Sequence, residues 1–351
     1  MRILLTGGGT AGHVWPVVLT ASSLSKNKRN KILYVGSRQG VEREIVKGFN
    51  IPFRAILSGK RRNYFSISNF WDLFKTFLGI IQAFFIFLFF RPKVIFAKGG
   101  YVTVPIIFWV RFFKIPLVIH ESDVVMGRAN LWASKKARKV CLGFPLKYYD
   151  QKLPIEKLVY TGIPVSPEFL QTSITSDDRP KILITGGSQG SSKINDLISE
   201  ILPDLLGRYE IWHLSGKRDF EKLNVFKNPY YHLFDFSYQV PKFMRDSDLV
   251  ISRAGASTLS EIAACGKSSI IIPLETAANE HQVANGEVLE KLNAAVVVSE
   301  KNLTANSLET IIEHLMNDKK TRDLLGHHAK SLFRDDAVEE IISCLFEVSK
   351  K

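Results

Sequence analysis

The sequence predicts an α/β protein made of two doubly wound domains, each built on a parallel sheet. Short apolar segments alternate along the chain with longer helical ones, as in strands joined by crossover helices. The phrase RILLTGGGTAG at 2–12 returns as KILITGGSQGSSKIN at 181–195, after a stretch at 161–180 that is rich in Pro, Ser and Thr. Each copy is a basic residue, an apolar strand and a glycine turn, so each begins a domain of its own.

The expected strands follow from the apolar segments. In the first half they are 2–6, 32–36, 94–97, 117–120 and 139–142. In the second half they are 181–185, 210–214, 231–234, 249–252, 269–273 and 295–298. We therefore expect a first domain over 1–162, a linker over 163–179 and a second domain over 180–335. Ligands of such sheets bind beyond the carboxyl ends of the strands, so two facing domains would share a central cleft.

The net charge of +13 on the 351 residues is unevenly distributed. Residues 1–170 hold 26 Lys and Arg against 8 Asp and Glu, whereas residues 171–351 hold 21 against 26. The first domain is therefore expected to meet an anionic surface, either nucleic acid or anionic lipid, since solubility alone would not explain the asymmetry. Three scattered cysteines and no visible signal peptide indicate the cytosol.

Residues 60–93 do not fit the alternation. From Phe77 to Phe90 only Gly79 and Gln82 interrupt an apolar run, and these 14 residues are fewer than the roughly 20 that span a bilayer. The apolar residues at helical spacing are Phe70, Trp71, Phe74, Phe77, Leu78 and Ile81, and the basic residues around them are Lys60, Arg61, Arg62, Lys75, Arg91 and Lys93. Aromatic and basic residues together favour a helix lying in a membrane interface, with a wholly buried helix as the alternative.

The first glycine loop matches the dinucleotide-binding pattern G-x-G-x-x-G at Gly7, Gly9 and Gly12. That pattern also needs an acidic residue at the end of the second strand to hold a ribose. The second strand ends in Gly36-Ser37-Arg38 instead, which argues against NAD or FAD. His13 follows the loop at the first turn of a helix, where it is either a general base or a residue that only bonds backbone.

Three further clusters follow apolar strands. They are Gly99–Tyr101, His120–Asp123 and Gly186–Gln189. In the second half, Ser252 ends a strand and residues 253–258 turn into a helix whose N–H groups suit a pyrophosphate. Glu261 lies about one turn further on, where a carboxylate can take two ribose hydroxyls. Gln282 and Asn285 share a helical face that suits a sugar.

Together these segments resemble the MurG family of glycosyltransferases. The matching phrases keep the family's order over residues 2–290: GGGTAGHVWP, SGKRRNYF, KGGYVTVP, HESD with ANLWASK, TGIPV, GGSQGSSKIN, SRAGAST with the E-x-AA-x-G that follows, and HQ-x2-N. The resemblance implies a GT-B fold, two Rossmann-like domains facing a cleft with a C-terminal helix over 336–351 crossing back. It implies an inverting transfer of GlcNAc from UDP-GlcNAc to the C4 hydroxyl of the muramoyl sugar in lipid I, which forms lipid II for peptidoglycan.

The resemblance also implies the roles of individual residues. His13 is the leading candidate for the general base, and Glu121 and His120 are the further catalytic candidates, both facing the acceptor. The acceptor side also includes Gly8, Gly9, Gly99, Gly100 and Tyr101, the glycines lying near the acceptor's pyrophosphate. The donor side includes Thr10, Gly12, Asn130, Ser188, Arg253, Ala256, Ser257 and Thr258, with Asn130 also facing the acceptor. Glu261 would hold the ribose, Gln282 and Asn285 the GlcNAc, and Phe236 begins the loop expected to face uracil.

The implied partners are UDP-GlcNAc, lipid I, an anionic membrane surface at the cytoplasmic face of the plasma membrane, and proteins of cell-wall synthesis or division. Nucleic acid is not among them, because no nucleic-acid motif accompanies the basic charge. No cofactor or metal is expected. The D-x-D pattern at 246–248 directly precedes a strand, which favours the end of a helix over a metal site.

One departure and several alternatives remain open in the sequence. Ser166-Pro167 stands after TGIPV, where the family often has an arginine that helps with the donor phosphates. Another GT-B enzyme that uses a nucleotide sugar, such as a UDP-GlcNAc 2-epimerase or a transferase with a soluble acceptor, is the nearest rival. An inactive membrane-bound sensor of UDP-GlcNAc is a third reading, which the intact His13, Glu121 and Glu261 disfavour.

Overall fold

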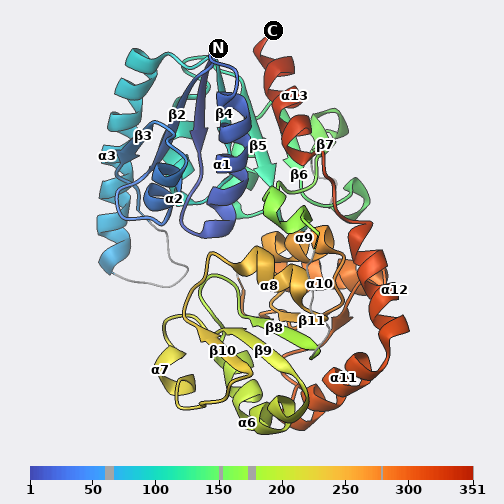
Figure 1. The fold of residues 1–351 in the computed structure, drawn as a ribbon. Coiled ribbons are helices and arrows are strands. Elements are labelled where there is room, and N and C mark those ends of the chain that lie inside the picture. Colours follow the sequence, from blue (N-terminus) through green and yellow to red (C-terminus); the bar gives the residue numbers. More distant parts are fainter. Residues whose placement is uncertain (60–66, 150–152, 173–178, 278–279, 351) are drawn as a thin grey trace. The chain divides into compact units, whose positions relative to one another are not determined.

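The chain folds into two compact units in a computed structural model (Figure 1). The structure describes residues 1–59, 67–149, 153–172, 179–277 and 280–350. Unit 1 comprises Met1–Pro164 and Arg334–Lys351, and unit 2 comprises Val165–Phe333. Lys60, Arg61, Arg62 and part of the expected linker lie outside the described residues.

Unit 1 is built on a seven-stranded parallel sheet with the strand order β3-β2-β1-β4-β5-β6-β7. Its strands are β1 (Arg2–Thr6), β2 (Lys31–Ser37), β3 (Phe53–Ile56), β4 (Val94–Ala97), β5 (Leu117–Glu121), β6 (Lys139–Leu142) and β7 (Leu158–Tyr160). Its α-helices are α1 (Ala11–Ser25), α2 (Glu42–Gly48), α3 (Ile67–Phe90), α4 (Val104–Trp109), α5 (Arg128–Ser134) and α13 (Ala337–Ser349). The order reverses at β1, between β2 and β4, which is where doubly wound sheets bind ligands.

Unit 2 repeats this plan with six parallel strands in the order β10-β9-β8-β11-β12-β13. They are β8 (Lys181–Thr185), β9 (Glu210–Leu214), β10 (Tyr231–Phe234), β11 (Leu249–Ser252), β12 (Ser269–Ile271) and β13 (Val296–Val297). The helices are α6 (Ser192–Arg208), α7 (Phe220–Leu223), α8 (Val240–Asp246), α9 (Ala256–Cys265), α10 (His281–Lys291), α11 (Ala305–Asn317) and α12 (Lys319–Lys330). The predicted fold class, two doubly wound parallel-sheet domains, is confirmed.

Burial explains which strands the sequence predicts. Ile3 and Leu5 of β1 and Phe96 of β4 are 0% exposed, because helices cover both faces of a parallel sheet. Strands β3 and β7 were not expected. Their residues FRAI and LVY are mostly exposed or half-buried, and both strands lie at the edges of the sheet, so they carry no continuous apolar run.

The helix α13 belongs to the core of unit 1, although it follows all of unit 2 in the chain. Ile341 and Leu345 of α13 are fully buried in one apolar cluster with Val14 and Val17 of α1 and with β1. Figure 1 shows α13 in red beside the sheet of unit 1.

The helix α3 is longer than the apolar run suggested. It has 24 residues, and within its segment Phe70–Phe90 an 18-residue window has a mean hydropathy of 2.1 with 17% of that window buried. In length and composition this segment could cross a membrane, which corrects the expectation that the run is too short. The alternative of a wholly buried helix is wrong.

One side of α3 is nevertheless attached to unit 1. The indole Nε1 of Trp109 donates to the carbonyl of Ile80 at 2.7 Å, and Gln82 accepts from the backbone N–H of Leu57 at 2.7 Å. In the chain, α3 follows β3 and precedes β4, and both strands belong to the same sheet. The large apolar side chains that remain exposed on α3 are Phe70, Trp71, Leu73, Phe74, Phe77, Ile81, Phe85, Leu88 and Phe89, while Leu78 is half-buried.

We expect Leu345→Ala to destabilise unit 1 by about 2–5 kcal/mol, because it opens a cavity in a fully buried cluster. Urea unfolding followed by circular dichroism measures the effect. The control is Ser343→Ala, which lies on the exposed side of the same helix and should change stability by less than about 0.5 kcal/mol. Equal midpoints for the two variants would contradict the assignment of α13 to this core.

Candidate functional site

The first glycine loop presents a threonine–histidine pair. Thr10 precedes α1, but its hydroxyl makes no capping bond to the helix and lies 2.8 Å from Nδ1 of His13. Both Gly9 and Thr10 are exposed. The Thr10 hydroxyl therefore fixes the imidazole ring, and a proton taken from a substrate would go to Nε2. The role of His13 as general base stays a prediction.

The two glycine loops assigned to the acceptor lie against each other in unit 1. A Cβ on Gly100 would lie 2.2 Å from the carbonyl oxygen of Gly8, and Gly100 has a φ of 82°. A Cβ on Gly9 would lie 3.1 Å from a ring carbon of Tyr101. Only glycine permits this approach at Gly100, so the two loops, distant in sequence, are in direct contact. Gly9 is exposed at this contact, and Gly100 and Tyr101 are half-buried.

A buried carboxylate lies beneath this contact, and sequence reasoning missed it. Glu42, the first residue of α2, is 0% exposed and accepts hydrogen bonds from the backbone and side chain of Ser37 at the end of β2. An acid therefore does reach the end of the second strand, from five residues further along the chain. Because Glu42 is buried and bonded to Ser37, its carboxylate offers no oxygen to a ribose. The argument against NAD or FAD therefore rests on the pairing of Glu42 with Ser37.

The HESD segment is turned inward. His120 is 0% exposed, and its Nε2 donates to the carbonyl of Gly162 at 2.8 Å. Burial, together with the nearby Lys98 cation, lowers the pKa of His120 well below its usual range, so the ring is neutral. In this structure His120 holds the segment after β7 and has no exposed surface for substrate.

Glu121 organises the turn that follows β5. Its carboxylate accepts from the backbone N–H of Asp123 at 3.1 Å, from that of Gly127 at 3.0 Å and from the amide of Asn130 at 3.0 Å. Burial and the charge of Asp123 raise the pKa of Glu121, and the Lys98 cation opposes this shift. Lys98 is itself 1% exposed, a second residue that sequence reasoning missed. Its only signal was a lysine at the end of an otherwise apolar strand.

Asn130 joins this cluster to the glycine loop at Gly99. Its amide nitrogen also donates to the carbonyl of His120 at 3.1 Å. Its Oδ1 atom is buried and has no hydrogen-bond partner among the described residues, and a Cβ on Gly99 would lie 2.9 Å from it. Asn130 therefore packs against the buried side of the Gly99 loop, and its exposed fraction is 3%.

In unit 2 the second glycine loop leads into α6. Ser188 is exposed, and the Ser191 hydroxyl caps the helix by accepting from the N–H of Ile194 at 3.4 Å. Behind the loop, Asn195 donates to the carboxylate of Asp219 at 2.8 Å and accepts from Nε2 of His213 at 3.0 Å. Burial lowers the pKa of His213 to about 3, so the imidazole of His213 is neutral in this network.

Arg253 is engaged with protein groups at the end of β12. It is 7% exposed, and its guanidinium donates to the carbonyl oxygens of Ile272 at 3.1 Å and Pro273 at 3.3 Å and to Glu300 at 2.7 Å. Its charge is therefore paired in this structure. The residues Ala256, Ser257 and Thr258 form the first turn of α9, which Gly255 precedes.

The residues assigned to ribose and sugar differ in exposure. Burial raises the pKa of Glu261 on α9 to about 8. Gln282 accepts from the N–H of Leu274 at 3.0 Å, while Asn285 is 0% exposed and donates to the carbonyl of Ala254 at 3.0 Å. Asn285 thus holds the turn before α9. Phe236 is 53% exposed and stacks edge-on against Tyr238, which suits a planar base.

The residues of the D-x-D pattern have structural contacts. Asp246 ends α8, as the sequence indicated, and Asp248 accepts from the backbone N–H of Lys181 at 2.8 Å. Within the described ranges, no group of three or more His, Cys, Asp or Glu side chains could hold a metal ion.

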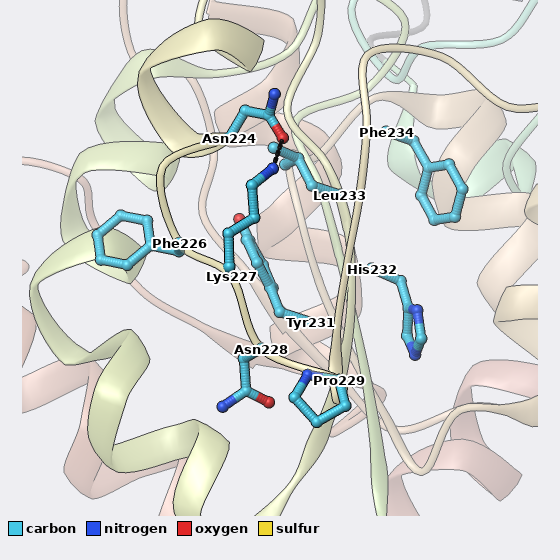
Figure 2. A pocket seen from close by; sticks show the side chains of 9 residues that line it. All are labelled: Asn224, Phe226, Lys227, Asn228, Pro229, Tyr231, His232, Leu233 and Phe234. Carbon is cyan, nitrogen blue, oxygen red and sulfur yellow. Dashed lines mark hydrogen bonds between the residues drawn. The ribbon is translucent and has the colours of Figure 1, made fainter.

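The hollows found on the surface lie elsewhere. One of about 640 Å³ lies along the edge strand β10 of unit 2, and Figure 2 shows its lining, with Lys227 bonded to Asn224 at 2.7 Å. None of its described lining residues is a predicted site residue. Another, of about 630 Å³, lies in unit 1 and is lined by Val110, Arg111, Lys114, Ile115, Pro116, Lys136, Arg138, Lys139, Glu156, Lys157, Glu347 and Val348.

Comparison with known proteins agrees with this architecture. The N-terminal domain of glycosyltransferase family 28 matches residues 3–142, and its C-terminal domain matches residues 181–341. A relative from Lachnoclostridium phytofermentans is 37% identical over 364 residues, covering 100% of this chain and 99% of its own. It is named UDP-N-acetylglucosamine–N-acetylmuramyl-(pentapeptide) pyrophosphoryl-undecaprenol N-acetylglucosamine transferase.

Solved structures share the fold. MurG of Acinetobacter baumannii has a TM-score of 0.78 at 24% identity, covering 99% of both chains. A UDP-N-acetylglucosamine 2-epimerase described from Listeria monocytogenes has a TM-score of 0.75 at 12% identity, covering 99% of this chain and 96% of its own. At these identities the likeness shows the fold alone. The two domain matches and the full-length relative show more: the chain belongs to glycosyltransferase family 28, among the MurG enzymes.

Proposed function

We propose that this protein transfers N-acetylglucosamine from UDP-GlcNAc to the C4 hydroxyl of the muramoyl sugar in lipid I, with inversion, and so forms lipid II. The observation that carries the proposal is identity of 37% along the whole chain to a transferase named for this reaction. The pair formed by the exposed Thr10 and the half-buried His13 supports it, because it supplies an oriented base in the unit assigned to the acceptor.

His13 is the base in this proposal. In the tautomer that can accept a proton at Nε2, Nδ1–H donates to the Thr10 hydroxyl. As Nε2 removes the proton from the acceptor hydroxyl, the oxygen attacks the anomeric carbon and the bond to UDP breaks on the opposite side. The imidazolium that forms stays bonded through Nδ1 to Thr10, which keeps the ring in place.

Unit 2 holds the donor. The departing diphosphate gains negative charge, and the N-terminal ends of α6 and α9 carry partial positive charge near the glycine turns at 186–190 and 253–255. Because the cation of Arg253 is paired with Glu300, we assign most of the stabilisation to these backbone groups. Arg253 shapes the turn by holding the carbonyls at 272 and 273.

We infer that α3 lies in the interface of the cytoplasmic face of the plasma membrane. Nine of its large apolar side chains are exposed, and so are Phe108 of α4 and Phe112, which follows α4. The hollow of about 630 Å³ described above adds six Lys and Arg residues in the same unit, which suits anionic lipid. Attachment of α3 to the sheet favours lying in the interface over spanning.

The nearest rival, a UDP-GlcNAc 2-epimerase or a transferase with a soluble acceptor, leaves this exposed surface without a role. Soluble substrates need no aromatic surface of this size, since monomeric proteins rarely expose large apolar patches without a partner. A lipid-linked acceptor explains the exposed apolar surface, because the enzyme must then work at the membrane. Purified protein supplied with UDP-GlcNAc and either a lipid I analogue or no acceptor distinguishes the two, since epimerisation without transfer would favour the rival.

We expect His13→Ala to lower kcat for GlcNAc transfer to a lipid I analogue by about 10²–10⁴-fold, because the acceptor loses its base. The KM for UDP-GlcNAc should stay within about twofold, since this proposal assigns His13 to the acceptor and the nucleotide sugar mainly to residues of unit 2. His314→Ala, an exposed histidine of α11, is the control and should transfer normally. Near-normal turnover of His13→Ala would remove it from the role of base.

The raised pKa of Glu261 predicts a pH dependence of donor binding. Burial moves this pKa from 4.5 to about 8, so the carboxyl is mostly neutral at pH 7 and ionised above pH 8. The ionised carboxylate accepts hydroxyl hydrogen bonds more strongly, so the KM for UDP-GlcNAc should fall as pH rises from 7 to 9. Glu261→Gln should raise the KM and flatten this profile. A profile identical to that of the parent protein would contradict the ribose assignment.

Membrane binding is tested by flotation with liposomes that contain anionic phospholipid. Phe74→Ser with Phe77→Ser should reduce the bound fraction several-fold, because two exposed aromatic rings no longer enter the interface. Transfer to a water-soluble lipid I analogue should be retained. Val225→Ser, which removes an apolar side chain that is 73% exposed on unit 2, is the control. Undiminished flotation of the double variant would overturn the assignment of α3.

A further inference from the structure

The buried Glu42 connects two loops of unit 1. One of its oxygens, Oε1, accepts from the backbone N–H of Ser37 at 2.8 Å and from the Ser37 hydroxyl at 2.6 Å. The other, Oε2, accepts from the backbone N–H of Gly9 at 3.5 Å. A carboxylate that is 0% exposed thus ties the end of β2 to the first glycine loop.

Three glycines make room for this carboxylate. A Cβ on Gly8 would lie 2.7 Å from Oε1 of Glu42, and a Cβ on Gly40 would lie 2.0 Å from Oε2. A Cβ on Gly36 would lie 2.8 Å from Cγ of the same side chain. Cβ atoms in proteins do not approach other heavy atoms this closely, so a larger residue at any of these three positions would displace Glu42. Gly8, which the sequence suggested would leave space for a phosphate, leaves space for Glu42.

A second buried group holds the loop from the same side. The hydroxyl of Tyr34 on β2 donates to the carbonyl of Gly7 at 2.8 Å. Burial and the charge of Glu42 raise the pKa of Tyr34 well above its usual range, so this phenol keeps its proton and remains a donor. The carbonyl of Gly7 and the N–H of Gly9 are therefore both fixed from β2 and α2.

The charge of Glu42 excludes a direct role in binding phosphate. A buried carboxylate repels an anion, and its oxygens are already bonded to Ser37 and Gly9. The N–H of Gly9 is likewise directed at Glu42. What Glu42 can do is set the path of the loop that carries Thr10 and His13 towards the acceptor.

We propose that Glu42 is a positioning residue, which holds the glycine loop 7–10 so that Thr10 and His13 meet the acceptor. The proposal rests on the proposed function, because it assigns this loop to lipid I. Glu42 acts through the loop and touches no substrate. The resemblance placed Thr10 and Gly12 on the donor side, whereas this proposal assigns the loop to the acceptor because Thr10 bonds His13. The effect of Glu42 is therefore expected on the acceptor side, with the donor residues of unit 2 unchanged.

The test compares Glu42→Gln with Glu44→Gln, which lies exposed on the same helix and serves as the matched control. An amide at position 42 replaces one accepting oxygen with a donor, so either Gly9 or Ser37 loses its partner. The kcat/KM for a lipid I analogue should then fall by about tenfold or more, with the KM for UDP-GlcNAc within twofold. Glu42→Asp, which keeps the charge, should recover part of the loss. Glu44→Gln should behave as the parent protein.

Hydrogen–deuterium exchange gives a readout that is independent of activity. The amides of residues 7–13 should exchange faster in Glu42→Gln than in Glu44→Gln, while those of the loop 186–191 stay unchanged. An unchanged acceptor kcat/KM, or a parallel rise in the KM for both substrates, would overturn the proposal, as would unchanged exchange at 7–13. If the parent protein itself transfers nothing to lipid I, the proposed function fails, and the exchange data alone then decide whether Glu42 holds the loop.

Discussion

The candidate site of unit 1 depends on close contact between backbones that leaves no space for a Cβ. The loop at Gly8 and the loop at Gly100 touch through main-chain atoms, and Glu42 occupies the space beneath them. Two side chains assigned to the acceptor, His13 and Tyr101, directly follow the loops that make this contact. A change of one carbon atom at Gly8 or Gly100 would therefore alter the site more than a change at an exposed polar residue.

The buried strands and the site loops were predictable, and the reason is local. A strand that is covered on both faces has a continuous apolar sequence. In this chain the glycine turns of the site directly follow such strands. The edge strands β3 and β7 lack this pattern. The length of α3 was underestimated because the polar residues Asp72 and Lys75 interrupt its apolar run, although Asp72 is itself buried and paired with Lys75 at 3.4 Å.

The partners of the site residues were not predictable, because they come from distant parts of the chain. Glu42 reaches Gly9 across 33 positions, and Arg253 reaches Glu300 across 47. No spacing rule connects such pairs. Sequence comparison with a family identifies that His120 and Asn285 matter, yet in the structure both are fully buried and hold backbone. A motif alone does not distinguish a residue that holds a loop in this way from one that contacts substrate.

The place of α13 in unit 1 has a consequence for synthesis on the ribosome. The apolar face that Ile341 and Leu345 cover belongs to a unit whose other residues emerge long before them, separated by all of unit 2. Unit 2 is continuous in sequence and can fold as soon as it leaves the tunnel. Until unit 2 and α13 have been synthesised, the part of the unit 1 core that α13 covers stays exposed to water and to chaperones. The last segment to be synthesised therefore completes the core of the unit that is synthesised first.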